Sequence, residues 1–189
     1  MLVKICGITN RDDALAAAEA GASAIGFNFY RNSPRYISPT GAAMIAEKLP
    51  GTIWKVGVFV NETAETIAKI AIEVGLDVAQ LHGSSEARGI RIWQAISAIN
   101  PVIGDAEAVL IDSPTDTAVG GTGKTWDWSQ APNLEQKIII AGGLDAENVR
   151  QAIEQAHPWG VDACSRLEKS PGLKDHEKMR KFVEAALAS

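Results

Sequence analysis

Eight short apolar segments alternate with helical patterns along the whole of this 189-residue chain. The apolar segments cover 2–8, 23–29, 53–60, 78–83, 91–97, 108–112, 137–143 and 160–165. Most of them are apolar at nearly every position, which is typical of strands buried on both faces of a parallel sheet. Because parallel strands need crossover connections, usually helices, this alternation constrains the fold more strongly than any other feature.

Amphipathic segments fill most of the gaps between the strands. We predict helices over 12–21, 38–48, 63–74, 145–156 and 174–187. Ser38 followed by Pro39 is a typical cap and first-turn pair, and Asp145 is expected to cap the segment that it opens. Only 84–90 and 98–107 remain for the fourth and fifth helices. These two helices are therefore expected to be shortened, either of them to a single turn.

Eight strand–helix units are the number that closes a (β/α)₈ TIM barrel. We therefore expect an α/β fold in which residues 1–189 form a single compact barrel domain. An open, doubly wound parallel sheet is the alternative that the pattern leaves open. In a barrel, the active site lies at the carboxyl ends of the strands, so the residues that end the strands are the candidates for chemistry.

The composition is that of an ordinary soluble protein, with 46% hydrophobic residues, 22% charged residues and a net charge of -5. The charges are interspersed and form no basic tract, which argues against a nucleic-acid partner. The two cysteines are too few for a disulfide framework. Neither they nor the three histidines have the spacing of a metal-binding cluster. No signal peptide or membrane-spanning segment is recognisable. We expect a cytoplasmic protein without a membrane partner.

Cys6 and Asp112 end the first and the sixth predicted strands. A thiolate at a barrel rim can take a proton from carbon if its pKa is lowered, and a carboxyl group in an enclosed site can donate a proton if its pKa is raised. Such a pair suits an isomerisation that moves a proton between a heteroatom and carbon. Each residue also has a plainer interpretation. Cys6 would then be a small buried hydrophobic residue, and Asp112 would be a structural residue that caps its own loop.

Other strand ends suggest binding groups for a phosphorylated ligand. Gly142, Gly143 and Ser165 follow the seventh and eighth strands, where barrels frequently bind phosphate through backbone N–H groups. Arg35 offers the planar guanidinium that pairs with a carboxylate, although a surface-loop arginine would look the same in sequence. His82 lies at the end of the fourth predicted strand, where a core histidine that is hydrogen-bonded to the barrel rim is an equal alternative, and we expect it to have only a supporting role.

The segment AVGGTGKT (118–125) is similar to a nucleotide-binding P-loop, but Ala118 replaces the first glycine. A P-loop joins a strand directly to a long helix. Here further loop residues follow Asp112, and the sequence after the segment allows only a short helix. We therefore interpret this segment as a loop beside a barrel active site.

Eight motifs, in order along nearly the whole chain, resemble those of phosphoribosylanthranilate isomerases. They are KICGIT (4–9), GFNFY…SPRYIS (26–38), VGVFVNE (56–62), QLHG (80–83), LIDS (110–113), GGTGKTWDW (120–128), AGGLDAENV (141–149) and PGLKD (171–175). KICGIT and GGTGK–DW together are specific to this family. The resemblance implies a TIM barrel and a role in tryptophan biosynthesis.

The reaction that the resemblance implies is an Amadori rearrangement of N-(5-phosphoribosyl)anthranilate to 1-(2-carboxyphenylamino)-1-deoxyribulose 5-phosphate. It implies that Asp112 is the general acid, that Cys6 is the base for the ribose C2 proton, and that Arg35 meets the anthranilate carboxylate. It also places the remaining substrate contacts at His82, Gly142, Gly143, Asp162 and Ser165. No metal or organic cofactor is implied, because the iminium intermediate acts as the electron sink. The expected partner is this small phosphorylated substrate, and the chain is expected to be a monomer or a homodimer.

The chain departs from the family pattern near its end and in its fifth strand. The family usually has V-D-x-S-S-G-V-E where this chain has VDACSRLE (161–168), so that Cys164 replaces a serine and Arg166 replaces a glycine of the phosphate loop. Arg166 would either pair with the phosphate or point to solvent. RIWQAIS (91–97) lacks a lysine that is often found there.

Two alternatives to this reaction remain. A related barrel isomerase for an aminoaldose of the histidine pathway would normally use two aspartates, and Cys6 disfavours it. A non-catalytic binder of a phosphorylated sugar is the other alternative.

Overall fold

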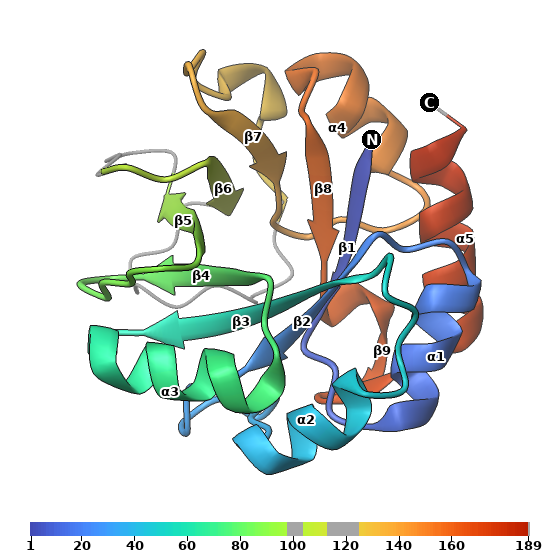
Figure 1. Ribbon diagram of the computed structural model, residues 1–189. Helices are drawn as coiled ribbons and strands as arrows, with labels where there is room; N and C mark the ends of the chain where they lie inside the picture. The colour runs from blue at the N-terminus through green and yellow to red at the C-terminus, as the bar shows by residue number, and fades with distance from the viewer. Residues whose placement is uncertain (98–103, 113–124, 189) are drawn as a thin grey trace.

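The computed structural model describes residues 1–97, 104–112 and 125–188. Eight parallel strands close into a barrel, in which each strand pairs with the next and β8 pairs with β1 (Figure 1). The strands are β1 Leu2–Cys6, β2 Ala24–Asn28, β3 Trp54–Val60, β4 Val78–His82, β5 Arg91–Ser97, β6 Ala108–Asp112, β7 Lys137–Ile140 and β8 Gly160–Ala163. The predicted TIM barrel is confirmed. The open, doubly wound alternative is wrong, because the pairing of β8 with β1 closes the sheet.

Five α-helices are found in the described part of the chain: α1 Arg11–Glu19, α2 Pro39–Ala46, α3 Ala64–Val74, α4 Val149–Ala156 and α5 His176–Leu187. Ser38 caps α2 as predicted, because its Oγ accepts from the Gly41 N–H at 3.1 Å. None of the described helices is both long enough and apolar enough to cross a membrane.

The prediction that Asp145 caps α4 is wrong. The helix begins at Val149, and Asn148 occupies the cap position. The Asp145 carboxylate instead accepts from the backbone N–H groups of Glu147 and Asn148, at 2.9 and 3.2 Å, and so holds the turn that precedes the helix.

The expected fourth helix is absent rather than shortened. Residues 84–90 contain only turns and irregular backbone, and Gly83 before them and Gly89 within them both have a positive φ. Residues 98–103 of the stretch expected for the fifth helix lie outside the described residues, as does most of the P-loop-like segment. The short helix expected after that segment is a single 3₁₀ turn, η1 Trp128–Gln130.

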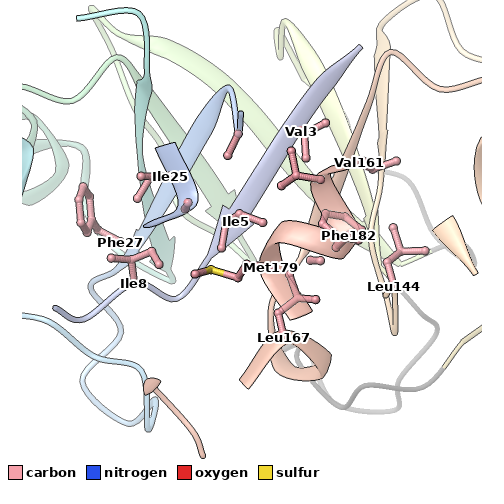
Figure 2. Close-up of a cluster of buried hydrophobic side chains, with 14 of the residues drawn as sticks. Val3, Ile5, Ile8, Ile25, Phe27, Leu144, Val161, Leu167, Met179 and Phe182 are labelled. Atoms are coloured by element: carbon pink, nitrogen blue, oxygen red, sulfur yellow. The ribbon is translucent and has the colours of Figure 1, made fainter. Parts of the chain in front are cut away.

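The outward-facing side chains of the strands pack against the helices. Figure 2 shows this core between the barrel wall and the C-terminal helix, with labelled residues that include Val3, Ile5, Ile25, Phe27, Met179 and Phe182. Because successive residues of a strand point to opposite faces, the residues between them face the inside of the barrel. A second apolar cluster, which includes Leu2, Trp93 and Leu110, fills the inside.

The inward-facing residues change from apolar to polar along several strands. In β1 the inward series is Leu2, Lys4 and Cys6. The corresponding series are Val78, Gln80 and His82 in β4, Ala108, Leu110 and Asp112 in β6, and Gly160, Asp162 and Cys164 along and just after β8. The amino-terminal end of the barrel is therefore apolar, and its carboxyl-terminal end carries ionisable groups.

Candidate active site

A cavity of about 160 Å³ opens at the carboxyl ends of the strands. Cys6, Arg35, His82, Asp112 and Asp162 all line this mouth cavity. A smaller side hollow of about 40 Å³ adjoins it and is lined by Gly142, Gly143, Ser165 and Arg166, among others. Asp112, Asp162 and Cys164 line both spaces. The structure therefore brings together every residue of the predicted site.

Cys6 is buried at the end of β1 and lies among positive charges. The neighbouring Cys164 thiol, followed by the positive charge of Lys4, lowers the pKa of Cys6 well below its usual range, and this effect outweighs burial, which raises that pKa. A Cβ at Gly26 would lie only 2.8 Å from the Cys6 sulfur and 3.1 Å from the Lys4 Nζ. The sulfur and the ammonium nitrogen are therefore less than about 6 Å apart, within the range over which an opposite charge stabilises a thiolate.

Lys4 is fully buried inside the barrel, and its Nζ donates to Asp162 Oδ1 at 2.9 Å. Burial raises the pKa of Asp162 to about 7, against the opposing charge of Lys4. The negative charges of Cys6 and Asp112 contribute to the same increase. Asp162 is thus partly protonated near neutral pH. When Asp162 is protonated, the positive charge of Lys4 stabilises chiefly the Cys6 thiolate.

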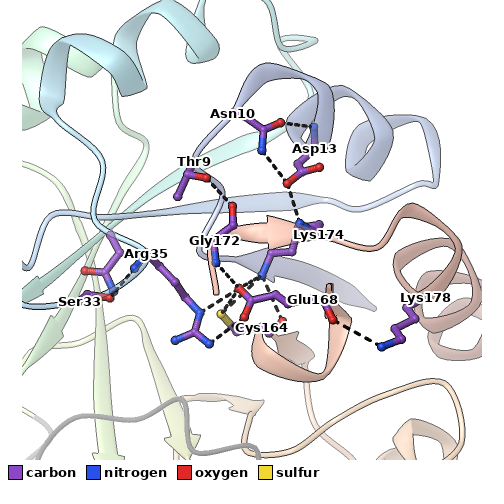
Figure 3. Close-up of polar contacts among 11 residues, drawn as sticks. Thr9, Asn10, Asp13, Ser33, Arg35, Cys164, Glu168, Gly172, Lys174 and Lys178 are labelled. Atoms are coloured by element: carbon purple, nitrogen blue, oxygen red, sulfur yellow. Dashed lines mark hydrogen bonds and ion pairs between the residues drawn. The ribbon is translucent and has the colours of Figure 1, made fainter. Parts of the chain in front are cut away.

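Arg35 is held by a buried carboxylate (Figure 3). Its Nε and Nη2 donate to the two carboxylate oxygens of Glu168 at 2.9 and 2.8 Å, and Lys174 Nζ donates to Glu168 Oε1 at 2.9 Å. Burial alone would raise the pKa of the Glu168 carboxyl group. The hydrogen bonds and positive charges of Arg35 and Lys174 outweigh burial and lower this pKa. Such a bidentate pair fixes the plane of the guanidinium. Arg35 is therefore a positioned part of the cavity wall.

His82 presents a neutral imidazole to the cavity. Burial is the main cause that lowers the pKa of His82 to about 4. The side-chain amide of Gln80 lies 3.0 Å from His82 Nε2. An amide N–H must donate to an unprotonated ring nitrogen in this pair, which places the ring proton on Nδ1. The ring can therefore orient a ligand but carries no charge at neutral pH.

The sequence comparisons agree with this geometry. The sequence profile of the N-(5'phosphoribosyl)anthranilate (PRA) isomerase family matches residues 3–185. The chain belongs to this family. It is 48% identical to the N-(5'-phosphoribosyl)anthranilate isomerase of Solibacter usitatus, over all of this chain and 98% of the relative. It is 43% identical to the enzyme of the same name from Acidithiobacillus ferrooxidans, over 96% of this chain and 95% of the relative.

Solved structures of phosphoribosyl anthranilate isomerases have the same fold. The structure from Thermus thermophilus superposes with a TM-score of 0.89 at 32% identity, over all of this chain and 99% of its own. The structure from Thermotoga maritima gives a TM-score of 0.86 at 37% identity, over the whole of both chains. A further isomerase structure, in complex with reduced 1-(o-carboxyphenylamino)-1-deoxyribulose 5-phosphate, gives 0.83 at 36% identity, again over the whole of both chains.

Two glycines and an arginine line the side hollow of this phosphoribosylanthranilate isomerase family member. Gly142 and Gly143 have φ of +88° and +64°, values that favour glycine and expose the backbone to the hollow. Arg166 lines the hollow at its rim, where its Nη1 donates to Asp145 Oδ2 at 2.6 Å. The side chain of Arg166 is 40% exposed. It is thus neither buried in the hollow nor directed wholly to solvent.

The sequence analysis missed three charged residues of this phosphoribosylanthranilate isomerase site: Lys4, Glu168 and Lys174. Lys4 could have been found, because it lies two residues before Cys6 and a strand places such residues on one face. Glu168 and Lys174 lie within motifs that were recognised, VDACSRLE and PGLKD, but not at the ends of barrel strands. Nothing in the sequence links Glu168 with Arg35, which is 133 residues away.

Proposed function

We propose that this chain converts N-(5-phosphoribosyl)anthranilate to 1-(2-carboxyphenylamino)-1-deoxyribulose 5-phosphate, with Cys6 as the general base and Asp112 as the general acid. Membership of the isomerase family supports the reaction, which belongs to tryptophan biosynthesis. One observation supports the roles of the residues: a thiol with a lowered pKa, a carboxyl group and a positioned guanidinium line the same cavity.

Asp112 protonates the ring oxygen of the ribose, and the ring opens to an iminium ion. The Cys6 thiolate then removes the proton from C2, and the electron pair of that C–H bond neutralises the iminium nitrogen. The resulting enolamine tautomerises to the ketone. Asp112 ends β6 and Cys6 ends β1, with β7 and β8 between them in the barrel wall. The two groups can therefore approach the ring oxygen and C2 from different sides.

The remaining residues bind and orient the substrate. The guanidinium of Arg35 pairs with the anthranilate carboxylate, while Glu168 keeps its plane fixed. The backbone N–H groups near Gly142, Gly143 and Ser165 hold the phosphate in the side hollow. The neutral ring of His82 and the carboxyl group of Asp162 complete the wall of the mouth cavity.

The wider organisation is part of the same proposal. Residues 1–189 form one barrel domain that acts in the cytoplasm on this small substrate, as a monomer or a homodimer. Among related proteins, the isomerase from Thermotoga maritima is described as dimeric. Size-exclusion chromatography with light scattering would distinguish the two oligomeric states.

The test is a fluorescence assay that follows the loss of freshly generated N-(5-phosphoribosyl)anthranilate. The unmodified chain should exceed the spontaneous rate, and Cys6→Ser and Asp112→Asn should each lose about 10²–10⁴-fold, as expected for a general acid or base. Losses within about tenfold at both positions would remove both assignments. A chain that binds a phosphorylated sugar but does not exceed the spontaneous rate would instead be a non-catalytic binder.

A further inference from the structure

Cys6 and Cys164 are the two cysteines of the chain, and both are free thiols that line the mouth cavity. We propose that they form a modification site: a peroxide oxidises the pair to an intramolecular disulfide, which switches the enzyme off reversibly. The loss of activity rests on the proposed role of Cys6 as the base, whereas the formation of the disulfide does not.

The pairing of β1 with β8 places the two cysteines side by side. The register pairs Ile5 with Ala163, so Cys6 and Cys164 are the next residues along the two strands. Neighbouring strands lie about 4.8 Å apart, and disulfides join cysteines whose Cα atoms are about 4.4–6.8 Å apart. The backbone spacing at this position therefore suits a disulfide without displacement of either strand.

The side chains of the two cysteines also face the same space. Two positions earlier, Lys4 and Asp162 are opposite each other in the register, and Lys4 Nζ lies 2.9 Å from Asp162 Oδ1. Because the side chains of a strand alternate between its two faces, Cys6 and Cys164 are the next pair that points into the barrel. The contact of Lys4 with Asp162 shows that inward-facing side chains of β1 and β8 meet.

Glycines beside the cysteines leave room for the two sulfurs. A Cβ at Gly7, the residue after Cys6, would lie 2.9 Å from the Cys164 sulfur, which therefore leans from β8 toward β1. The Cys6 sulfur lies on the side of the other neighbour of β1, 2.8 Å from the position of a Cβ at Gly26 in β2. A change of the Cys6 χ1 rotamer would turn its sulfur toward Cys164, and the cavity that both residues line provides the space.

Cys164 can adjust its position because it lies outside the barrel wall. It follows the end of β8 and precedes a 3₁₀ turn. Two long contacts hold its sulfur, from Lys174 Nζ at 3.6 Å and to Glu168 Oε1 at 3.9 Å. These residues belong to the strand pair β9 Glu168–Ser170 and β10 Leu173–Lys174. Since a thiol is a weak donor and a weak acceptor, these contacts would yield to a covalent bond.

The oxidation consists of two balanced steps, written here for hydrogen peroxide. The Cys6 thiolate, which the charge of Lys4 stabilises, attacks one peroxide oxygen; the O–O bond breaks, hydroxide leaves, and Cys6 becomes a sulfenic acid. The Cys164 sulfur then attacks the Cys6 sulfur, so that an S–S bond forms and the S–O bond breaks. The departing hydroxide takes the Cys164 proton, and the first hydroxide takes the proton that Cys6 had released. The two sulfurs together lose two electrons, and the peroxide is reduced to two molecules of water.

The disulfide would remove the base and also protect it. Cys6 within a disulfide has no thiolate to take the C2 proton, but thiols reduce a disulfide back to two cysteines. Without a second thiol, a sulfenic acid can continue to a sulfinic acid, which thiols do not reverse. Serine, which the family pattern usually has at the position of Cys164, cannot form the link. Cys164→Ser is therefore the matched control.

The decisive experiment exposes the unmodified chain and Cys164→Ser to hydrogen peroxide, blocks the remaining thiols with iodoacetamide, and maps the unreduced peptides by mass spectrometry. The unmodified chain should lose the mass of two hydrogen atoms and yield a peptide pair joined through Cys6 and Cys164. Its kcat/KM should fall about 10²–10⁴-fold, as for loss of the base, and dithiothreitol should restore it to within about twofold. Cys164→Ser should instead gain oxygen at Cys6 and, relative to its own unoxidised rate, should recover much less with dithiothreitol.

The peptide map does not require turnover, so it tests the modification site even if the proposed reaction is wrong. Oxygen added to Cys6 of the unmodified chain without the link would overturn the proposal, and so would a link between two chains, seen as a dimer on a non-reducing gel. A link that forms while kcat/KM is unchanged would overturn the switch and, with it, the role of Cys6 as the base. If Cys164→Ser does not fold, the peptide map of the unmodified chain and its recovery with dithiothreitol decide the question.

Discussion

The two ends of the barrel are built from opposite kinds of side chain. At the amino-terminal end, Trp54, Trp93 and Trp159 pack together, with the Trp93 ring centroid 5.9 Å from both of the others. At the carboxyl-terminal end, the buried residues Lys4 and Asp162 form an ion pair, and Asp162 lines the mouth cavity together with Cys6. Aromatic burial stabilises a fold directly, whereas buried ions stabilise it little or not at all even when they are paired. The amino-terminal end is therefore built for stability and the carboxyl-terminal end for chemistry.

The surface of the amino-terminal end supports this interpretation. Arg91 lies over the Trp54 ring at 4.9 Å, and Lys137 lies over the Trp159 ring at 4.7 Å. These cations cover the aromatic cluster on its solvent side and can add cation–π attraction. Substitutions at the two ends should thus separate stability from activity, and the following predictions test that separation from the largest expected effect to the smallest.

Trp93→Ala should lower the free energy of unfolding by about 3–5 kcal/mol, as expected when a buried aromatic side chain is removed. Urea denaturation followed by circular dichroism would measure it. The activity of the molecules that remain folded should be unchanged. Trp93→Phe is the matched control and should cost much less, because it keeps an aromatic ring and removes an indole N–H that has no hydrogen-bond partner among the described residues. Equal losses in both variants would contradict the role given to ring packing.

Glu168→Gln should affect both stability and substrate binding. It replaces charged hydrogen bonds to Arg35 and Lys174, so the free energy of unfolding should fall by about 1.5–3 kcal/mol. KM should rise more than kcat falls, because the plane of Arg35 is no longer fixed. Steady-state kinetics on the folded variant would measure both constants. A fall in kcat at constant KM would show instead that Glu168 acts on the chemical step.

The same carboxylate predicts an acid-sensitive fold. The pKa of Glu168 is lower in the folded chain than in the unfolded chain, so its stabilising contribution is present above the unfolded pKa and is lost as the pH falls through the folded value. The free energy of unfolding of the unmodified chain should therefore decrease below about pH 4.5. Glu168→Gln should show a smaller decrease over that range, and an identical acid dependence would contradict the prediction.

Gly26→Ala should lower activity and cost about 1–3 kcal/mol of stability, as for overpacking of a filled interior. Its Cβ would meet the Cys6 sulfur and the Lys4 ammonium group. Gly51→Ala is a suitable control, because a Cβ there would meet no atom within 4 Å. Unchanged kcat/KM in Gly26→Ala would show that the position of the thiol is not critical.

Arg166→Gly should have the smallest effect, because Arg166 is partly exposed and already pairs with Asp145. Affinity for a phosphate-bearing product analogue, measured by calorimetry, should change less than about tenfold, the scale of one solvent-exposed ionic contact. A larger loss of affinity would place the guanidinium on the phosphate. Gly142→Ala, at a positive φ in the same hollow, should weaken binding more.

The sequence predicts the barrel well because its strands are buried on both faces. Each of the eight predicted segments contains a strand, and the strand-end rule brought Cys6 and Asp112 to the same cavity. The fourth helix was wrongly expected, because strand counting alone does not show whether a connection is helical. The cap at Asp145 was wrong because the same side chain can hold a turn before a helix begins.

The parts of the site that the sequence did not reveal depend on contacts between distant segments. Arg35 is paired with Glu168 because the short antiparallel strand pair after β8 lies beside the loop that follows β2. Cys164 likewise lines the same cavity as Cys6 because β8 pairs with β1. A carboxylate, an ammonium and a thiol have no periodic pattern that would show them to be neighbours.

The most direct test of the contrast between the two ends measures kcat/KM and the free energy of unfolding on the same preparations of Asp112→Asn and Trp93→Ala. Asp112→Asn should lose about 10²–10⁴-fold in kcat/KM while its free energy of unfolding stays within about 1 kcal/mol of the original. Trp93→Ala should lose several kcal/mol of stability, about 3–5, and keep its activity once folded. If Asp112→Asn kept its activity, or if Trp93→Ala lost activity without losing stability, the division of the barrel into a stabilising end and a catalytic end would be wrong.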